Sequence, residues 1–454
     1  MQTVQEDIRQ LGVDSLWHAL TQHKPLKDKP PMHIVRGEGC YIYDSEGNSY
    51  LDALAGLWCV NVGYGRKELA EIAKEQMTEL AYLAPTMSHP KAILLADKLL
   101  KLLDIQGHVY FASSGSEANE AAFKIARQYQ MQIGQYRRYK IISRHRAYHG
   151  NTFAAMTATG QAERKIGYDP LAPGFLHIPP PYPYRRHEKL TVEEHGDYAA
   201  QMLEDTIIYE GVETVAAFIM EPMISGGGVI VPPDNYIAKI RQICDRYGVV
   251  LIFDEVVSGF GRTGKLFGHW HWGIKPDIIT FAKGISSGYM PLSATVVSNR
   301  IFEAFYGEAN ELKHFRHVNT YSAHPASTAV GLANIEIMLR EDLPDNAMRM
   351  GAYIREGLKE LEDHPYVGEI RGKGLLLGIE TVADKTTKEP LAGSVIAGIL
   401  NTCKEMGVLI GRNGNTVPGL ANVLIMAPPL VLSEADADKI VHALKTAFAK
   451  SLAS

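Results

Sequence analysis

Cysteine is scarce in this sequence. Its 454 residues include only four, Cys40, Cys59, Cys244 and Cys403, and no two of them have the CxxC spacing of a zinc site or a redox motif. Disulfide frameworks are typical of small, cysteine-rich secreted chains. We therefore expect neither a disulfide framework nor a structural metal site, and a location in a reducing cytoplasm.

Long apolar runs and an excess of one charge are also missing. The longest apolar runs, such as VAAFIM (215–220) and VVLIF (249–253), are far shorter than the ~20 residues of a membrane span. The first residues, MQTVQEDIRQLG, carry acids and glutamines where a signal peptide has basic and then apolar residues. The net charge is −5, with acids and bases interspersed. We expect a soluble protein without nucleic-acid or membrane partners.

A chain of this length favours more than one domain. Residues 34–52 predict a small antiparallel unit that turns at 44–47. From about residue 65 to 320, short apolar strands alternate with amphipathic helices, which predicts a mainly parallel sheet covered on both faces. The expected strands are 109–113, 139–143, 216–221, 249–255 and 277–283, with helices at 116–132 and 234–247. We expect an N-terminal segment (1–64), a large domain (65–325) and a C-terminal small domain (326–454) with strands inside 367–380 and 422–430.

Chemically useful side chains follow these strands. Ligands of parallel sheets bind at the carboxyl ends of the strands, where this sequence places 114–116, Glu221, Asp254, Glu255 and Lys283. Burial of an unpaired ammonium is disfavoured, and a lysine held there in its neutral form is a nucleophile. Taken alone, a surface lysine just past a strand end is the more common case. Because these polar residues converge on one edge of the sheet, we favour a functional site there.

The stretch SSGSEANE opens a helix. Ser114 and Glu117 have the spacing of a capping box, and free N–H groups at such a helix end bind anions. A plain helix cap explains the stretch equally well. Tyr148 and His149 follow another strand, where an aromatic ring either stacks on a planar ligand or simply packs.

Two further patterns point to other chemistries, which we disfavour. Residues 259–265 have the GxxxxGK spacing of a nucleotide phosphate loop, but Leu266 stands where the magnesium-binding Ser or Thr is needed. His269 and His271 lack a third metal ligand nearby.

Taken together, the motifs resemble one family along nearly the whole chain. YLDALAGLWCVNVGYG, SSGSEANE, YHGNT, EPMISGGG, DEVVSGFGRTG, FAKGISSGYMPLSA, NTYSAHP and RGKGLLLGIE are similar to segments of the class III aminotransferases, and the spacing of 29 residues from Asp254 to Lys283 agrees. The resemblance implies pyridoxal 5′-phosphate (PLP) as cofactor and the α/β fold type I of PLP-dependent transferases, with a small α+β domain built from both termini. It also implies a homodimer whose active site lies at the subunit interface.

The resemblance implies a role for each motif residue. Lys283 would form a Schiff base with the PLP aldehyde and then shuttle a proton, and Asp254 would pair with the pyridine N–H. Tyr148 would stack on one face of the ring as a third catalytic residue, and Val256 would pack on the other. The other implied cofactor contacts are Ser114, Gly115 and Ser116 at the phosphate, Thr320 from the neighbouring subunit, and His149 and Glu221.

The substrate segments are similar to those of omega-transaminases. Leu57 and Trp58 would face the amine donor, and Arg412, in GRNGNTVPGL, would bind a carboxylate or sulfonate with Glu221 as its acidic partner. This implies transfer of an amino group from an omega-amino acid or amine, of the taurine or β-alanine type, to pyruvate as the keto-acid acceptor. An enzyme that uses 2-oxoglutarate (with 4-aminobutyrate, a diamine or ornithine) and a non-transaminating PLP enzyme are the alternatives.

Overall fold

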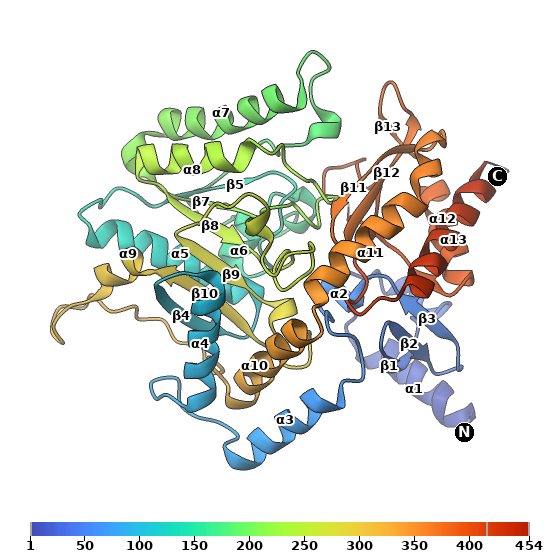
Figure 1. Ribbon diagram of the computed structural model, residues 1–454, viewed down its shortest axis with the longest axis horizontal. Coiled ribbons are helices and arrows are strands. Elements are labelled where there is room, and N and C mark those ends of the chain that lie inside the picture. The colour runs from blue at the N-terminus through green and yellow to red at the C-terminus, as the bar shows by residue number, and fades with distance from the viewer. Residues whose placement is uncertain (1, 415, 453–454) are drawn as a thin grey trace.

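A computed structural model describes residues 2–414 and 416–452 of the protein. The chain forms a large lobe around a central sheet and a smaller lobe in which both chain ends lie (Figure 1). The α-helices are α1 (Gln2–Ser15), α2 (Ala55–Trp58), α3 (Lys67–Glu79), α4 (Pro90–Leu103), α5 (Gly115–Gln132), α6 (Phe153–Ala158), α7 (Val192–Glu210), α8 (Tyr236–Tyr247), α9 (Asn299–Phe302), α10 (Pro325–Arg340), α11 (Leu343–Gly357), α12 (Gly393–Glu405) and α13 (Glu434–Ser451). Within the described residues, no helix combines the length and the apolar character needed to cross a membrane.

The central sheet has the strand order β4-β10-β9-β8-β7-β5-β6. Its strands are β4 (Gly107–Ala112), β5 (Lys140–Arg144), β6 (Phe175–Ile178), β7 (Val215–Met220), β8 (Val250–Asp254), β9 (Ile278–Phe281) and β10 (Ser293–Ser298). All run parallel except β10, which pairs antiparallel with β4 and β9. The structure has a strand at each of the five predicted positions. The sequence prediction missed β6 and β10, because β6 is short and lies between proline-rich turns and β10 begins and ends with serine.

Both faces of the sheet are buried, as the continuous apolar runs predict. On β7, Phe218 and Met220 pack with residues of α7 and α8 on one side. Ala217 and Ile219, which point the other way, pack with α5. Figure 1 shows α7 and α8 lying together along one side of the sheet. The carboxyl ends of the parallel strands therefore meet at one edge that no strand covers.

The small lobe joins the two ends of the chain through its sheets. One sheet has the order β1-β2-β3-β14 and the other β11-β12-β16-β15, with β13 on β12. The strands are β1 (Ile34–Glu38), β2 (Tyr41–Asp44), β3 (Ser49–Asp52), β11 (Val367–Lys373), β12 (Leu376–Asp384), β13 (Glu389–Pro390), β14 (Val408–Leu409), β15 (Gly411–Arg412) and β16 (Val423–Met426). The antiparallel unit predicted for residues 34–52 is present, and β14 pairs with β3 in parallel.

A buried ionic cluster ties the small lobe to the large one. Arg371 Nη1 lies 2.7 Å from Glu380 Oε2, and Arg185 Nη2 lies 2.6 Å from Glu380 Oε1. The Tyr182 hydroxyl also donates to Glu380, and Arg371 Nη2 donates to the carbonyl of Gly228 at 2.6 Å. Burial alone would raise the pKa of Glu380, but Arg371 and Arg185 bring it below its usual value. The cluster holds the loop at 224–229 against β11 and β12.

Candidate active site

A cavity of about 350 Å³ lies at the carboxyl ends of the parallel strands. It is lined by residues that follow β4, β5, β8 and β9: Ser113–Ser116, Tyr148–Gly150, Asp254, Val256, Ala282 and Lys283. Leu57, Cys59, Asn119 and the segment 286–292 complete its walls. The structure thus brings together most of the side chains that the sequence predicted at this edge.

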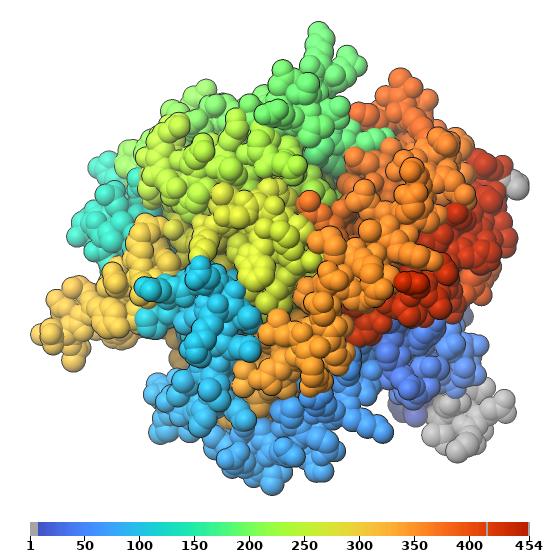
Figure 2. All heavy atoms as spheres, viewed as in Figure 1, coloured from blue at the N-terminus to red at the C-terminus, as the bar shows by residue number. Residues whose placement is uncertain are grey.

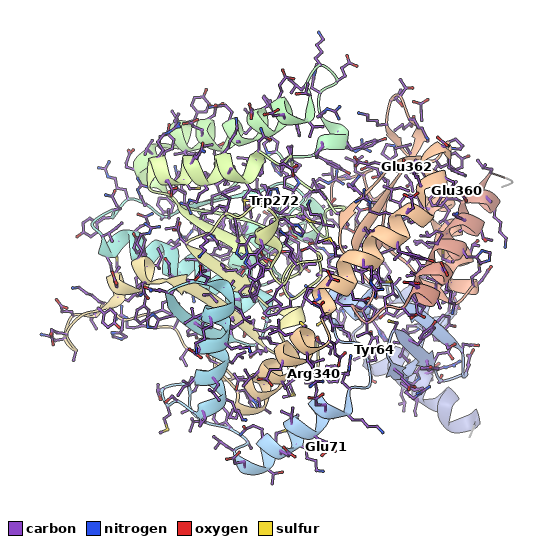
Figure 3. All side chains as sticks on the ribbon, viewed as in Figure 1. Tyr64, Glu71, Trp272, Arg340, Glu360 and Glu362 are labelled. Atoms are coloured by element: carbon purple, nitrogen blue, oxygen red, sulfur yellow. The ribbon has the colours of Figure 1, made fainter. Side chains whose placement is uncertain are left out.

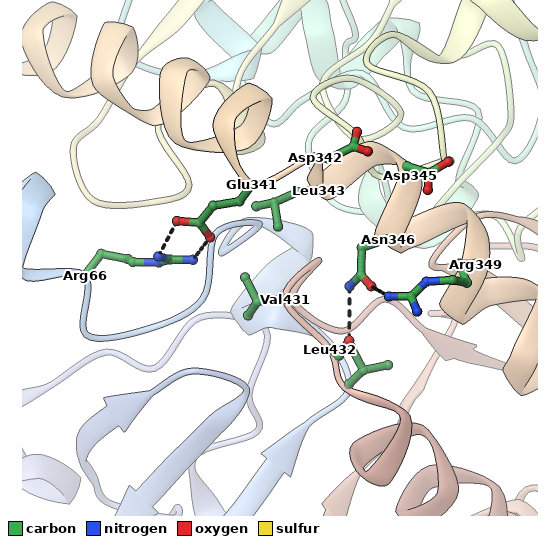
Figure 4. A pocket seen from close by; sticks show the side chains of 9 residues that line it. All are labelled: Arg66, Glu341, Asp342, Leu343, Asp345, Asn346, Arg349, Val431 and Leu432. Carbon is green, nitrogen blue, oxygen red and sulfur yellow. Dashed lines mark hydrogen bonds and ion pairs between the residues drawn. The ribbon is translucent and has the colours of Figure 1, made fainter.

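A second hollow, of about 430 Å³, lies between the α10–α11 turn and residues 431–432 (Figure 4). Four of its polar side chains form two pairs. Arg66 is bound to Glu341 through two hydrogen bonds of 2.8 and 2.6 Å, and Arg349 donates to Asn346 at 2.8 Å. Because these groups satisfy one another, the candidate site is the cavity at the strand ends.

Lys283 lines this cavity immediately after β9. It begins the 3-10 helix η6 (Lys283–Ile285) with φ +47, a left-handed conformation that is costly for a residue with a side chain. Burial lowers the pKa of its ammonium, which Cys59, Asp254 and Glu221 only partly oppose. Among the described residues, no hydrogen bond or ion pair occupies Nζ. The structure therefore favours a neutral, free amine at this point.

Asp254, at the end of β8, is held by three donors. Its Oδ1 accepts the N–H of Val256 at 3.1 Å, and its Oδ2 accepts Asn119 Nδ2 and His149 Nδ1, each at 2.8 Å. Thr280 Oγ1 donates to Asn119 Oδ1 at 2.8 Å, which fixes the orientation of the amide. These contacts fix the orientation of the buried carboxylate.

Sequence reasoning missed Asn119 and Thr280. The available signal was Asn119 itself, a polar residue in the apolar stripe of its helix, next to Ala118, Ala121 and Ala122. A buried polar side chain on such a face requires a partner. Which partner it finds depends on how the helix is rotated against the sheet.

The amino end of α5 forms another wall of the cavity. The capping box is present: Ser114 Oγ accepts the N–H of Glu117 at 3.2 Å, and Glu117 Oε2 accepts that of Ser114 at 3.1 Å. Within the described chain, the N–H groups of Gly115 and Ser116 have no acceptor and are free for an anion. A Cβ at Gly115 would lie 3.1 Å from the methyl groups of Val256, so only glycine packs there without a shift.

Two of the predicted acids point away from the cavity. Glu221 accepts the N–H groups of Tyr148 at 3.1 Å and Ser225 at 2.9 Å. We had expected Arg412 as its partner, and the structure shows these two backbone groups instead. Burial raises its pKa. Glu255 lies 2.8 Å from His269 Nδ1 on the far side of β8. The hydrogen-bond donors around each carboxylate, rather than its position at a strand end, therefore determine where the side chain points.

The segment that carries Leu57 and Trp58 is a strained turn held by Asp52. Ala55, Gly56 and Trp58 all have positive φ. The buried Asp52 carboxylate accepts the N–H of Leu54 at 3.0 Å and of Gly56 at 2.6 Å. It also accepts the hydroxyl of Tyr64 at 2.7 Å. Tyr64 lies where the N-terminal sheet meets the large lobe (Figure 3). Through these bonds Asp52 positions Leu57 at the mouth of the cavity.

Arg412 and Thr320 lie outside this cavity. Gly411 of β15 faces Leu54, so Arg412, the next residue of the strand, points the other way, with Nη1 3.9 Å from where a Cβ on Gly393 would lie. Its side chain is exposed, and residue 415 of the same segment lies outside the described residues. Thr320 is also exposed, and its carbonyl accepts the hydroxyl of Tyr82 at 3.1 Å.

The phosphate-loop pattern at 259–265 has a structural explanation. Lys265 Nζ donates to the carbonyl of Trp270 at 3.1 Å, and Arg262 is fully buried, donating to Asn61 at 2.7 Å. The lysine that would bind phosphate is thus engaged with its own segment, and the cavity lies elsewhere.

The residues around the cavity fit PLP. A free amine of lowered pKa is suited to an aldehyde, and a fixed carboxylate is suited to a protonated pyridine nitrogen. The unpaired N–H groups at the amino end of α5 are suited to a phosphate. Tyr148 and Val256 both line the cavity and offer flat and apolar contacts for a ring.

Comparison with known proteins agrees with this fit. The family model "Aminotransferase class-III" matches residues 23–448. A taurine–pyruvate aminotransferase of Bilophila wadsworthia is 44% identical over 446 residues, 95% of each chain. A putrescine–pyruvate aminotransferase of Pseudomonas aeruginosa is 41% identical over 426 residues, 93% of this chain and 91% of the relative. The crystal structure of an omega transaminase from Pseudomonas jessenii in complex with PMP covers 98% of both chains with a TM-score of 0.94 and 35% identity.

We expect the turn at 54–58 to depend on the charge of Asp52. Asp52→Ala removes two N–H acceptors and the partner of Tyr64, and should lower the free energy of unfolding by about 2–4 kcal/mol. Tyr64→Phe removes only the hydroxyl bond and should cost about 1 kcal/mol. Denaturant unfolding of both variants measures the difference. Equal losses would show that the backbone bonds to Asp52 are unimportant.

Proposed function

Because the chain belongs to the class III aminotransferases, which depend on PLP, we propose that it transfers an amino group from an omega-amino acid of the taurine or β-alanine type to pyruvate. The products are an aldehyde and alanine. The observation that carries the chemistry is the free amine of Lys283 in the same cavity as the fixed carboxylate of Asp254. The names of the two relatives support pyruvate as the acceptor.

Lys283 is the group that holds the cofactor and moves the proton. PLP supplies, when bound, a ring that accepts electrons from the carbon bearing the substrate amine. Nζ of Lys283 would hold the aldehyde end of the cofactor and, once the incoming amine releases it, would move a proton from the substrate carbon to the cofactor carbon. Its lowered pKa suits both roles, because only the neutral amine is a nucleophile or a base.

Asp254 supplies the electrostatic half of the site. Its negative charge favours a protonated pyridine nitrogen beside it. Asn119 and His149 hold Oδ2, so the carboxylate is already in place when the cofactor arrives. Tyr148 and Val256 would contact the two faces of the ring, and Ser114, Gly115 and Ser116 would hold the phosphate.

The substrate lies beyond the ring, against Leu57 and Trp58, with Arg412 as the group that binds its acid. Arg412 must swing from its exposed position to reach the cavity, and the glycine- and asparagine-rich segment that follows it supports such a movement. The two-step reaction uses this mobility, because the donor carries its acid far from the amine and pyruvate carries it adjacent. A 2-oxoglutarate-dependent enzyme and a non-transaminating PLP enzyme remain the alternatives.

The active form we propose is a cytoplasmic homodimer. Leu57 at the cavity mouth is 68% exposed, and Val318 and Tyr321, on either side of Thr320, are 64% and 63% exposed. Apolar side chains left open beside a cavity are typical of a surface that another chain covers. The loop before Thr320 stands away from the body of the molecule (Figure 2). A second copy would bring Thr320 to the phosphate of its neighbour. The free cysteines support a reducing compartment.

Asp254→Asn tests the electrostatic role. An amide no longer favours the pyridinium, so both half-reactions should slow severely while the fold is kept. Tyr148→Phe, which retains the ring, should lose far less. Single-turnover absorbance measurements report each half-reaction. Rates near those of the wild type in Asp254→Asn would contradict the role.

Arg412→Ala tests the substrate assignment. A hydrogen bond to a charged group contributes about 1.5–3 kcal/mol, so pyruvate and acidic donors should bind about ten- to a hundredfold more weakly. An uncharged amine should react as before. Arg340→Ala, which removes an exposed arginine paired with Glu68, is the control. If all substrates suffer equally, Arg412 is structural; if the wild type prefers 2-oxoglutarate, the pyruvate assignment fails.

A further inference from the structure

A second arginine lies next to the cavity without an acidic partner. Arg164 ends the 3-10 helix η2 (Ala162–Arg164), and its Cζ lies 5.7 Å from the ring centroid of Tyr148. Tyr148 lines the cavity. In the part of the chain that the structure describes, the guanidinium forms no ion pair or side-chain hydrogen bond. Contact with an aromatic face holds a cation in place without neutralising it.

The backbone beneath Arg164 is firmly held. The N–H of Arg146 donates to the carbonyl of Gly160 at 2.7 Å, and the N–H of Gly160 donates to the carbonyl of Ala147 at 2.9 Å. Gln161 is buried, and its Nε2 donates to the carbonyl of Arg146 at 3.1 Å. Arg164 N–H donates to the carbonyl of Gln161 at 3.2 Å. The start of the side chain is therefore fixed, and only the guanidinium is free to adjust.

The same loop adjoins the side chain of Trp58. A Cβ at Gly226 would lie 3.5 Å from both Gln161 Nε2 and Trp58 Cη2, so these two side chains are neighbours. The loop also contacts the segment that follows Arg412, because the N–H of Ala162 donates to the carbonyl of Thr416 at 3.3 Å. A Cβ at Gly414 would lie 3.7 Å from Arg164 Nη2. The guanidinium thus lies between Tyr148 and the segment that follows Arg412.

We propose that Arg164 binds the acidic group of the amine donor at the end remote from Lys283. The proposal rests on the proposed function, because it names a group that reads the acid of the same donor. A donor that extends along Tyr148 leads toward Arg164. A guanidinium offers a planar pair of donors to a carboxylate or a sulfonate. Arg164 shares the donor's acid with Arg412, and Arg412, exposed beside Gly393, alone binds pyruvate, whose acid is adjacent to the reacting carbon.

The test compares Arg164→Gln and Arg164→Lys with the wild-type holoenzyme in separate half-reactions. For taurine and β-alanine, Arg164→Gln should raise the half-saturating concentration about ten- to a hundredfold, with the rate at saturation kept. Propylamine and pyruvate should be unaffected. Arg164→Lys should restore part of the loss, because it keeps the charge. Equal losses for propylamine would overturn the proposal and leave Arg164 as a support for Tyr148.

Inhibition by ethanesulfonate separates this proposal from the proposed function. This anion lacks the amine, and its competition with propylamine does not require turnover of an acidic donor. Competition in the wild type that weakens about tenfold in Arg164→Gln supports the site. Equal inhibition of both proteins, or none of the wild type, overturns it. A wild type that uses propylamine but neither taurine nor β-alanine contradicts the donor class alone.

Discussion

The site depends on keeping an amine and a carboxylate at the ends of two neighbouring parallel strands. Asp254 pairs with Thr280 in the register of β8 and β9, and Lys283 follows three residues later. Thr280 then fixes Asn119 through its hydroxyl, and Asn119 fixes Asp254. The register of the sheet therefore sets both the spacing and the orientation of the reacting groups. A shift of one residue would turn these side chains into the opposite face.

The burial of Lys283 and Asp254 is the second condition on which the site depends. The cavity lowers the pKa of Lys283 because few groups nearby can solvate an ammonium. Asp254 is also buried, and three hydrogen bonds to its carboxylate replace the lost water. The cavity thus combines an amine of lowered pKa with a carboxylate held in a fixed orientation. General acid–base chemistry beside an electron-accepting ring requires both.

Much of this was accessible from the sequence, and the exceptions share a cause. Continuous apolar runs identify five central strands, and the residues after them identify Lys283 and Asp254. Asn119 was not predicted as a site residue, because its role depends on the rotation of α5 against the sheet. The expected pairing of Glu221 with Arg412 was wrong because Glu221 turns back to two backbone N–H groups. Side-chain directions set by distant packing are not encoded in local pattern.

The most direct test of the central claim is to reduce the holoenzyme with borohydride and map the cofactor by peptide mass spectrometry. Borohydride reduces the bond that a lysine amine has formed with the cofactor aldehyde to a stable secondary amine, so the label should fall on Lys283. Lys283→Ala should still retain cofactor through the amino end of α5 but lose it on denaturation after the same treatment. A label on another lysine, or no label on a protein that contains cofactor, would contradict the account.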